Sequence, residues 1–199
     1  MITRLSSLIQ KVSNWKIFCV LLVVYALYFS VFFYADVPFG LSKIKPYAGD
    51  TSILDVEMYY TPEQAYQRLA ILGEQGRAAY MRILMGDLVY PALLGSFLSV
   101  AITQVFRHAF PANSVWHKLN LLPLANMTVD YLENILLITL LTNYPTHLNG
   151  VATIAGFVTL VKNLFGLLSF LALGAGLVAL LYRGVSHWRS KRERPSTLK

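Results

Sequence analysis

Three ionisable residues lie within stretches that are otherwise apolar. Asp130 and Glu133 occur in MTVDYLENILLITLL, residues 127–141, and Lys162 occurs in a second apolar run. A charged side chain inside a membrane is costly, so it usually has a partner or a function. A carboxyl group beside an ammonium group can form a structural ion pair, or it can transfer protons if one carboxyl group stays protonated. The residue types therefore leave two interpretations open, a pair that fixes helix register and an acid/base site.

Polar residues recur at helical spacing on both of these segments. Four of them share one face of the predicted helix 119–142: Asn126, Asp130, Glu133 and Asn134. A comparable line on the next predicted helix comprises Gly156, Thr159, Asn163, Gly166 and Phe170. Such lines predict close helix contacts with hydrogen bonds across them, while Asn134 and Asn163 are also candidates for ligand binding.

The depths of these charges predict a contact. Lys162 lies 12 residues after position 150, while Asp130 and Glu133 lie 12 and 9 residues before position 142. At a rise of about 1.5 Å per residue, these side chains reach the same level if their helices are antiparallel neighbours. The short connection between the helices favours that arrangement.

A third predicted helix adds further candidate binding residues. Asp87 would lie in the outer half of the bilayer, with Arg77 and Arg82 above it, and Pro91 could kink the helix and free a backbone carbonyl group. Either arginine could contact an anion, although a snorkelling interface anchor is an equally good explanation for Arg77. The nearby Lys162 argues against a hard cation held by the carboxylates, so we expect no metal.

Four apolar stretches are long enough to cross a bilayer. The chain has 199 residues, of which 56% are hydrophobic, and a spanning helix needs about 20 mostly apolar residues. The predicted spans are residues 17–35, 80–106, 119–142 and 151–182. The first lacks the features of a cleaved signal peptide, so we interpret it as an anchor. The sequence thus predicts an all-α membrane protein, with residues 1–199 forming a single domain built as a four-transmembrane-helix bundle.

The distribution of charge predicts an orientation. The net charge is +7, and the lysines and arginines gather in the N-terminal flank, the second loop and the tail 183–199. Both termini in the cytoplasm therefore satisfy the positive-inside rule, and we expect a multi-pass protein of the plasma (inner) membrane. Nucleic acid is disfavoured as a partner because no aromatic-interleaved basic groove accompanies the charge.

The first loop, residues 36–79, contains a predicted amphipathic surface helix on the extracytoplasmic side. Thr61 can cap this helix, Pro62 fits its first position, and Gln64 completes a capping box, while Gly73 ends it. Such a helix can lie on the membrane surface or cover the end of the bundle.

Cysteine and histidine usage argues against redox cofactors. Cys19 is the single cysteine, so the chain can form no internal disulfide. His108, His117, His147 and His187 all fall in predicted loops or the tail, so no pair lies inside the bilayer to ligate a haem iron. We expect no cofactor.

The motifs also resemble those of a known group. TPEQAYQRLAILGEQGRAAYMRILMGDLVYP, followed by LPLANMTVDYLENILLITLLTNYP and a lysine in the last span, is similar to an uncharacterised family of small four-span integral membrane proteins with Gly-x-x-Gly-Arg and Asp-x-x-Glu-Asn motifs. The resemblance covers most of residues 60–165 and implies no activity. Its pattern would include Gly73, Gly76, Arg77, Tyr80, Asp87, Pro91, Pro123, Asp130, Glu133, Asn134 and Lys162.

Three functional hypotheses follow. The first is a polar intramembrane pocket that binds a lipid or amphipathic small molecule and could modify it, with Asp130 and Glu133 as acid/base groups and Lys162 as their partner. The second is a structural or accessory subunit, whose membrane-protein partner or second copy would contact Gly174 and Gly176. The third is an ion or proton pathway, disfavoured because the inner halves of the helices carry few polar groups. Whether a reaction is catalysed stays open.

Overall fold

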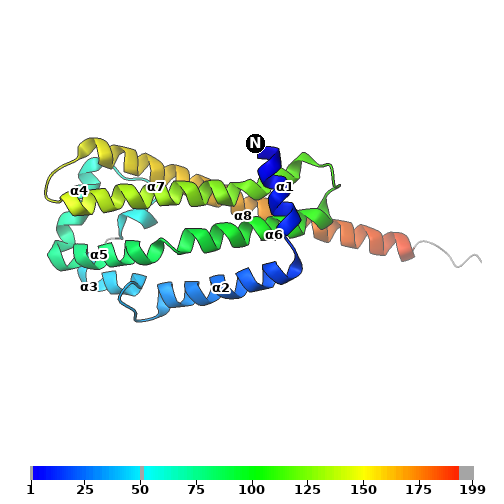
Figure 1. Ribbon diagram of the computed structural model, residues 1–199, viewed down its shortest axis with the longest axis horizontal. Helices are drawn as coiled ribbons and strands as arrows, with labels where there is room; N and C mark the ends of the chain where they lie inside the picture. Colours follow the sequence, from blue (N-terminus) through cyan, green and yellow to red (C-terminus); the bar gives the residue numbers. More distant parts are fainter. Residues whose placement is uncertain (1, 50–51, 193–199) are drawn as a thin grey trace, which may run out of the picture.

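All regular secondary structure that the computed structural model describes is helical. The structure describes residues 2–49 and 52–192, with side chains as far as residue 186. Figure 1 shows long helices side by side, with the short helices of residues 41–71 at one end and the N-terminal helix at the other. The α-helices are α1 Ile2–Val12, α2 Trp15–Tyr34, α3 Lys45–Ala48, α4 Pro62–Ile71, α5 Gly73–Asp87, α6 Tyr90–Ala109, α7 Leu122–Asn143 and α8 Asn149–Arg192. Three 3-10 helices join them: η1 Leu41–Ile44, η2 Leu54–Val56 and η3 Val115–Leu121.

Within the described residues, four helical segments are long and apolar enough to cross a membrane, as predicted, which is what a multi-pass membrane protein requires. They are Trp15–Tyr34, Gly73–Ala109, Val115–Asn143 and Asn149–Ser186. The second begins at Gly73 and not near residue 80, so the first loop is shorter than predicted.

The last helix is longer than a membrane is thick. α8 has 44 residues, which gives a length of about 66 Å, while the hydrocarbon core of a bilayer is about 30 Å thick. The helix thus extends beyond the predicted span 151–182, because it continues into the basic tail and projects past the other helices (Figure 1), and the position of the span's end stays a prediction. Residues 193–199 of the predicted tail lie outside the described residues.

The second membrane segment is broken where Pro91 predicts a disturbance. α5 ends at Asp87 and α6 begins at Tyr90, and the two turn residues between them leave carbonyl groups without a full set of helical partners. Neighbouring tyrosines donate hydrogen bonds to two carbonyl groups at the break. The Tyr28 hydroxyl donates to the Gly86 carbonyl at 2.5 Å, and the Tyr131 hydroxyl donates to the Leu88 carbonyl at 2.9 Å. The break thereby connects α5–α6 to both α2 and α7.

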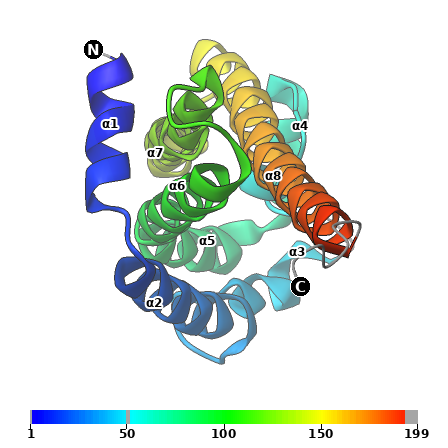
Figure 2. The ribbon, with the colours of Figure 1, turned by 90° about the vertical axis from the view of Figure 1, so that its right-hand side faces the viewer.

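α6, α7 and α8 pack against one another, while α2 contacts mainly α6 and lies at the edge (Figure 2). Aromatic rings join α2 to α6, with the ring centroids of Tyr25 and Phe97 5.4 Å apart. At the opposite end from the short helices, the Arg183 guanidinium donates to the Ala109 carbonyl at 3.0 Å. A cation at a helix C-terminus also complements the helix dipole, so this contact fixes α8 to the end of α6.

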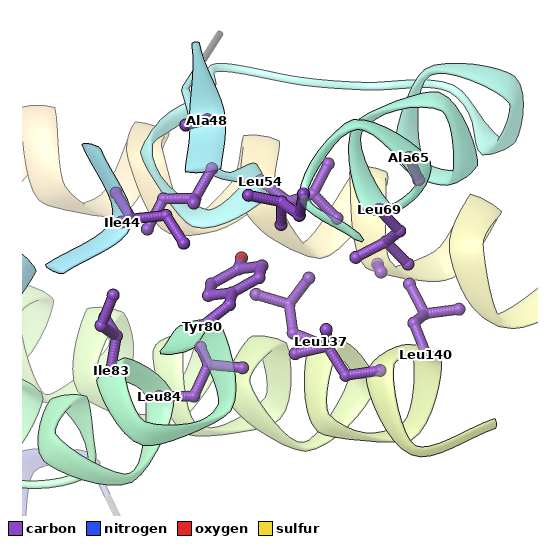
Figure 3. Close-up of a cluster of buried hydrophobic side chains, with 14 of the residues drawn as sticks. Ile44, Ala48, Leu54, Ala65, Leu69, Tyr80, Ile83, Leu84, Leu137 and Leu140 are labelled. Atoms are coloured by element: carbon purple, nitrogen blue, oxygen red, sulfur yellow. The ribbon is translucent and has the colours of Figure 1, made fainter. Parts of the chain in front are cut away.

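The largest apolar core lies where the first loop folds onto the helices. Figure 3 shows Leu54 and Leu69 from the loop facing Tyr80, Leu137 and Leu140 from α5 and α7. Leu54 is 1% exposed and Leu69 is fully buried. Burying a leucine contributes about 1.5–3 kcal/mol relative to exposure to water, so this loop is a packed part of the fold.

The helix predicted within that loop is present as α4. Its capping box is complete, because the Thr61 side chain accepts from the Gln64 backbone N–H and the Gln64 side chain accepts from the Thr61 N–H. Gly73 follows the helix with a φ of 61°, a conformation that favours glycine. Ala65 and Tyr66 on the buried face of α4 pack against the rest of the protein.

Candidate functional site

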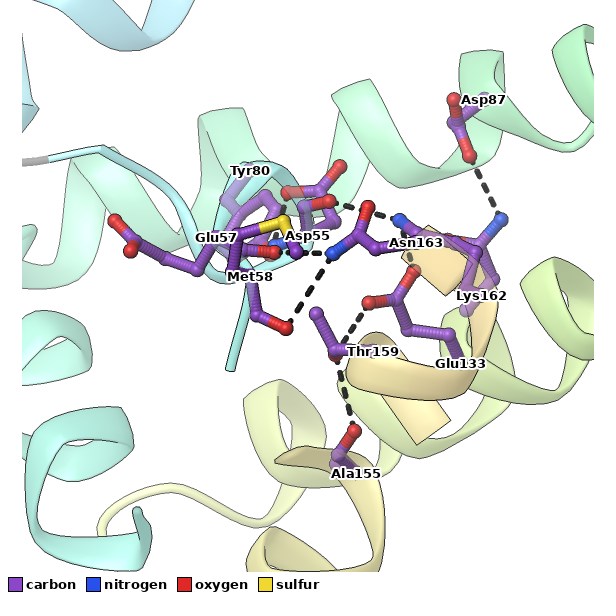
Figure 4. A network of polar contacts seen from close by, with 11 residues as sticks. Asp55, Glu57, Met58, Tyr80, Asp87, Glu133, Ala155, Thr159, Lys162 and Asn163 are labelled. Carbon is purple, nitrogen blue, oxygen red and sulfur yellow. Dashed lines mark hydrogen bonds and ion pairs between the residues drawn. The ribbon is translucent and has the colours of Figure 1, made fainter. Parts of the chain in front are cut away.

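The predicted contact between α7 and α8 is confirmed. The Lys162 ammonium lies 2.5 Å from Glu133 Oε2 (Figure 4). The Glu133 side chain has no exposed surface, and the Lys162 side chain is 13% exposed. The Thr159 hydroxyl lies 2.5 Å from Glu133 Oε1 and 3.0 Å from the Ala155 carbonyl oxygen. The Glu133 carboxyl group therefore has a partner on each oxygen.

The two asparagines have different partners. Asn134 Nδ2 donates to Asp87 Oδ2 at 2.8 Å, so it joins α7 to the end of α5 inside the protein. Asn163 Nδ2 donates to the Glu57 carbonyl at 2.7 Å, which places its partner in the first loop. The polar line on α8 thus meets a loop at this level, and not only another helix as predicted.

Part of the first loop inserts between the helices, which the sequence reasoning missed. Lys162 Nζ donates to the Asp55 carbonyl at 2.8 Å, so the ion-paired lysine also holds the loop backbone. A Cβ atom added to Gly156 would lie 2.1 Å from the Tyr60 carbonyl oxygen, which shows how closely the loop approaches α8. The signal in the sequence was the apolar pair Ile53 and Leu54 in front of an acid, because such residues in a loop indicate burial.

The insertion brings a further carboxyl group, that of Asp55, to the site. The Tyr80 hydroxyl donates to Asp55 Oδ1 at 3.0 Å, and Tyr80 is itself fully buried. Burial raises the pKa of the Asp55 carboxyl group above its ordinary value, while Lys162 and the Tyr80 hydrogen bond oppose the rise. A raised pKa indicates a carboxyl group that retains its proton more readily than one in water.

Asp130 is placed differently from the other acids. It is 7% exposed and, among the described residues, has no hydrogen-bond or ion-pair partner within contact distance. It lies within electrostatic reach of Lys162, whose nearest carboxylate is that of Glu133. Among the carboxyl groups of this site, that of Asp130 therefore makes the fewest contacts that stabilise the fold.

These groups surround a small cavity of about 100 Å³. The polar residues that line it are Asp55, Asp87, Asp130, Tyr90 and Lys162. Its apolar lining consists of Phe32, Phe33, Leu41 and Val56 from the end of α2 and the first loop. The cavity thus combines three carboxyl groups and one amine with an aromatic wall, whereas Glu133 lies behind the lysine and does not line it.

The predicted arginines are not part of this cavity. The Arg77 guanidinium lies 4.0 Å from the centre of the Tyr144 ring and donates to the Leu69 carbonyl at 2.8 Å, so it holds α4 and the end of α7 to α5. Arg82 is exposed and lines a separate surface groove with Lys43. Arg82 forms no ion pair with a carboxylate of the described residues, and its predicted role as an anion contact stays a prediction.

The arrangement can bind a cation or a hydrogen-bond donor and can exchange a proton with it. Within the described part of the chain, no three His, Cys, Asp or Glu side chains are grouped so that they could hold a metal ion. The chain matches no protein-family model, no curated protein and no solved structure in the comparisons made. The site must therefore be interpreted from its own chemistry.

Proposed function

We propose that the cavity binds the positively charged head group of a lipid or amphipathic small molecule within the membrane. The observation that carries the proposal is a cavity lined by three aspartates, one lysine and the rings of Phe32 and Phe33, in which Asp87 and Asp130 are only 8% and 7% exposed. A carboxylate in such surroundings is costly unless a cation or a proton neutralises it.

The charges favour a cationic guest over an anionic one. Lys162 already has Glu133 as a partner at 2.5 Å, so it neutralises that carboxylate first. Asp55, Asp87 and Asp130 then remain at the cavity with no second lysine or arginine lining it. An ammonium group would gain charge-assisted hydrogen bonds from these carboxyl groups, whereas a phosphate would be repelled.

The volume limits what can enter. About 100 Å³ corresponds to roughly three water molecules at their share of liquid volume, about 30 Å³ each. The head group fits such a space but a hydrocarbon chain does not. We infer that the chain of the guest lies outside the cavity along the aromatic wall that Phe32 and Phe33 form at the end of α2.

The proposal includes chemistry at Asp130. A general acid or base needs a carboxyl group that can reach the substrate and is free to exchange its proton. Asp130 lines the cavity and has no hydrogen bond to a described residue, whereas Glu133 is held by both Lys162 and Thr159. In a reaction on the guest, Asp130 would exchange the proton and Glu133 would keep Lys162 in place.

We further propose a four-helix bundle in the plasma (inner) membrane with both termini in the cytoplasm. The ends of α6 and α8 and the starts of α2 and α7 lie together, and the basic residues Lys16, Arg107, Lys118 and Arg183 accompany them. The positive-inside rule assigns this end to the cytoplasm. The cavity then lies in the outer half of the bilayer, and α4 lies on the extracytoplasmic side.

Thermal unfolding with three single-chain probes tests the proposed specificity. The full chain in phosphatidylcholine nanodiscs would be heated with dodecylamine, dodecanol or dodecanoate, which differ only in the charge and chemistry of the head group. We expect dodecylamine to raise Tm the most, because binding to the native state alone stabilises it. Asp130→Asn should remove most of that increase, while the matched control Asp36→Asn, at an exposed acid paired with Lys43, should retain it. Equal stabilisation by all three probes, or an unchanged response of Asp130→Asn, would contradict the proposal.

A structural or accessory role remains the second candidate. Its support is the outward face of α8, where Gly174 has no atom within 4 Å of an added Cβ and Leu171 and Leu177 are exposed. Gly176 does not belong to that face, because its added Cβ would lie 2.3 Å from Phe106. A second copy or another membrane protein could pack against Gly174. Native mass spectrometry that finds only monomer in native lipid would exclude this role.

An ion or proton pathway is less well supported. Two buried hydroxyl groups of the inner half donate within their own helices, that of Thr103 to the Ser99 carbonyl and that of Ser169 to the Phe165 carbonyl, each at 2.8 Å. A pathway needs groups that can pass a hydrogen bond along.

A further inference from the structure

In the N-terminal helix α1, the small polar residue Ser6 faces the protein and is 2% exposed, whereas Ile2, Leu8 and Val12 are each more than half exposed. The charged residues Arg4 and Lys11 are exposed as well. Exposed apolar side chains are unfavourable in water and favourable in lipid, so α1, which carries apolar and charged residues on its outer surface, has the pattern of an interfacial membrane helix.

Hydrogen bonds fix α1 at the end of the bundle where α2 and α7 begin. The Ser6 hydroxyl donates to the His117 carbonyl at 3.3 Å, and Asn120 Nδ2 lies 3.4 Å from the Ser6 carbonyl oxygen. The Arg107 guanidinium donates to the carbonyl groups of Gln10 and Ser13 at 2.5 and 3.0 Å. Figure 2 shows α1 standing beside α6 and α7.

A groove of about 440 Å³ runs between α1 and α7. Its walls are almost entirely apolar, with Ile2 and Leu5 from α1, Leu122, Leu124 and Ala125 from α7, and the leucines of η3. Lys118 is the single charged residue in this lining, and its side chain is exposed. An apolar groove with one exposed cation in its lining is complementary to a hydrocarbon chain that carries a negative group.

The surrounding charge has one sign. Residues 1–35 and 88–129 contain no aspartate or glutamate, while Arg4, Lys11 and Lys16 lie on or next to α1. Trp15 and Trp116 are 67% and 54% exposed near the same end, as expected of side chains at the level of lipid head groups. The local field therefore attracts anionic lipid.

We propose that the groove between α1 and α7 is a binding site for an anionic phospholipid. One acyl chain lies along Leu5, Leu122 and Ala125, and the phosphate group contacts Lys118. This site lies at the opposite end of the molecule from the carboxyl-lined cavity and does not depend on the function proposed for it. It makes α1 a lipid-binding element of the protein and not only a topology signal.

Native mass spectrometry of the full chain tests this site. The detergent-purified protein would be titrated with dioleoyl phosphatidylglycerol and with dioleoyl phosphatidylcholine, which share their acyl chains. We expect the first phosphatidylglycerol to bind more tightly than the first phosphatidylcholine. Lys118→Gln should weaken phosphatidylglycerol binding about fivefold, the effect of one cation near a lipid surface, and leave phosphatidylcholine binding unchanged. Lys16→Gln, at an exposed lysine outside the groove, is the charge control.

A second pair of variants tests whether lipid binding depends on the shape of the groove and not on charge alone. Ala125→Phe would fill the groove and should abolish tight binding of both lipids. Ala175→Phe makes the same change on the exposed side of α8 and should bind like the wild type. Thermal unfolding of both variants checks that they remain folded. Equal affinity for the two lipids, or unchanged binding by a folded Ala125→Phe variant, would overturn the proposal. A dimer lost in Ala125→Phe and insensitive to lipid would instead assign the groove to a second copy.

Discussion

The Glu133–Lys162 pair offers the sharpest prediction because its two members are not equivalent. Lys162 is the one cation at a cavity with three carboxyl groups, and Glu133 is a fourth acid behind it. If Glu133 becomes glutamine, Lys162 still has the Asp55 carbonyl at 2.8 Å and other carboxyl groups within electrostatic reach. If Lys162 becomes methionine, no other cation replaces it.

The magnitudes follow from that asymmetry. Lys162→Met leaves a fully buried carboxylate unpaired and removes a hydrogen bond to the loop, so it should destabilise the protein by about 3–5 kcal/mol. Glu133→Gln retains an oxygen that can accept from Thr159, so it should cost only about 1 kcal/mol. At about 2–4 °C per kcal/mol for a chain of this size, Tm should fall by about 6–20 °C in the first variant and about 2–4 °C in the second.

The double variant measures the coupling. Because it removes the carboxylate that Lys162→Met leaves unpaired, it should be more stable than Lys162→Met alone, by about 2 kcal/mol. Tryptophan fluorescence during heating at one scan rate, in lipid nanodiscs, gives all three values on one scale. The reasoning is refuted if Glu133→Gln costs as much as Lys162→Met, or if the double variant is no more stable than the lysine variant.

Three further predictions concern the first loop. Asp55→Asn should stabilise the protein at neutral pH. Burial raises the folded-state pKa of the Asp55 carboxyl group above the ordinary value of 3.8, so ionisation of this group destabilises the folded wild type at pH values above 3.8 and not below. The Tm difference between the variant and the wild type should therefore increase from about pH 4 upwards. Gly156→Ala should lower the free energy of unfolding by about 1–3 kcal/mol, because its Cβ would meet the Tyr60 carbonyl oxygen. The control Gly174→Ala, at a glycine with open space around it, should be neutral or stabilising by up to about 1 kcal/mol in the same denaturation assay. Thr61→Ala should lower the free energy of unfolding by about 1 kcal/mol, because it removes the N-cap of α4. Hydrogen exchange should become faster in α4 alone, and faster exchange throughout the chain would contradict this local effect.

Periodicity in an apolar segment predicted the helix faces well. A polar side chain in a membrane helix must face protein, so the spacing of Asp130, Glu133 and Asn134 indicated the buried side of α7, and all three are buried. The contact between Glu133 and Lys162 followed from matched depths across a short connection. Both inferences depend on regular helices, where position along the sequence determines position in space.

Other features depend on irregular backbone and could not be predicted in the same way. The prediction placed Arg82 near Asp87 from residue number alone. The direction of the Arg82 side chain depends on how α5 packs against the first loop. The apolar pair Ile53 and Leu54 could indicate that this part of the loop is buried, but the position of Asp55 depends on how η2 packs against α5 and α8, which that pattern does not determine. α1 was missed although Ile2, Leu5 and Val12 recur at helical spacing, because only the positive charges of that segment were considered.

The inserted loop makes the proposed site conditional on closure. Lys162 and Asn163 are consecutive on α8 and donate hydrogen bonds to the carbonyl groups of Asp55 and Glu57. One turn of the helix therefore binds the loop at two points. The same Lys162 lines the cavity, and the Asp55 side chain forms part of its wall. The cavity therefore exists in this form only while the loop is docked, since an undocked loop would remove one carboxyl group and admit water. Because Asp55 reaches a guest in the cavity only while the loop is docked, guest binding and loop docking must be energetically coupled. Lys162→Met should consequently lose both stability and dodecylamine binding, whereas Asp130→Asn should lose binding alone, and this difference separates the structural role of the lysine from the binding role of the acid.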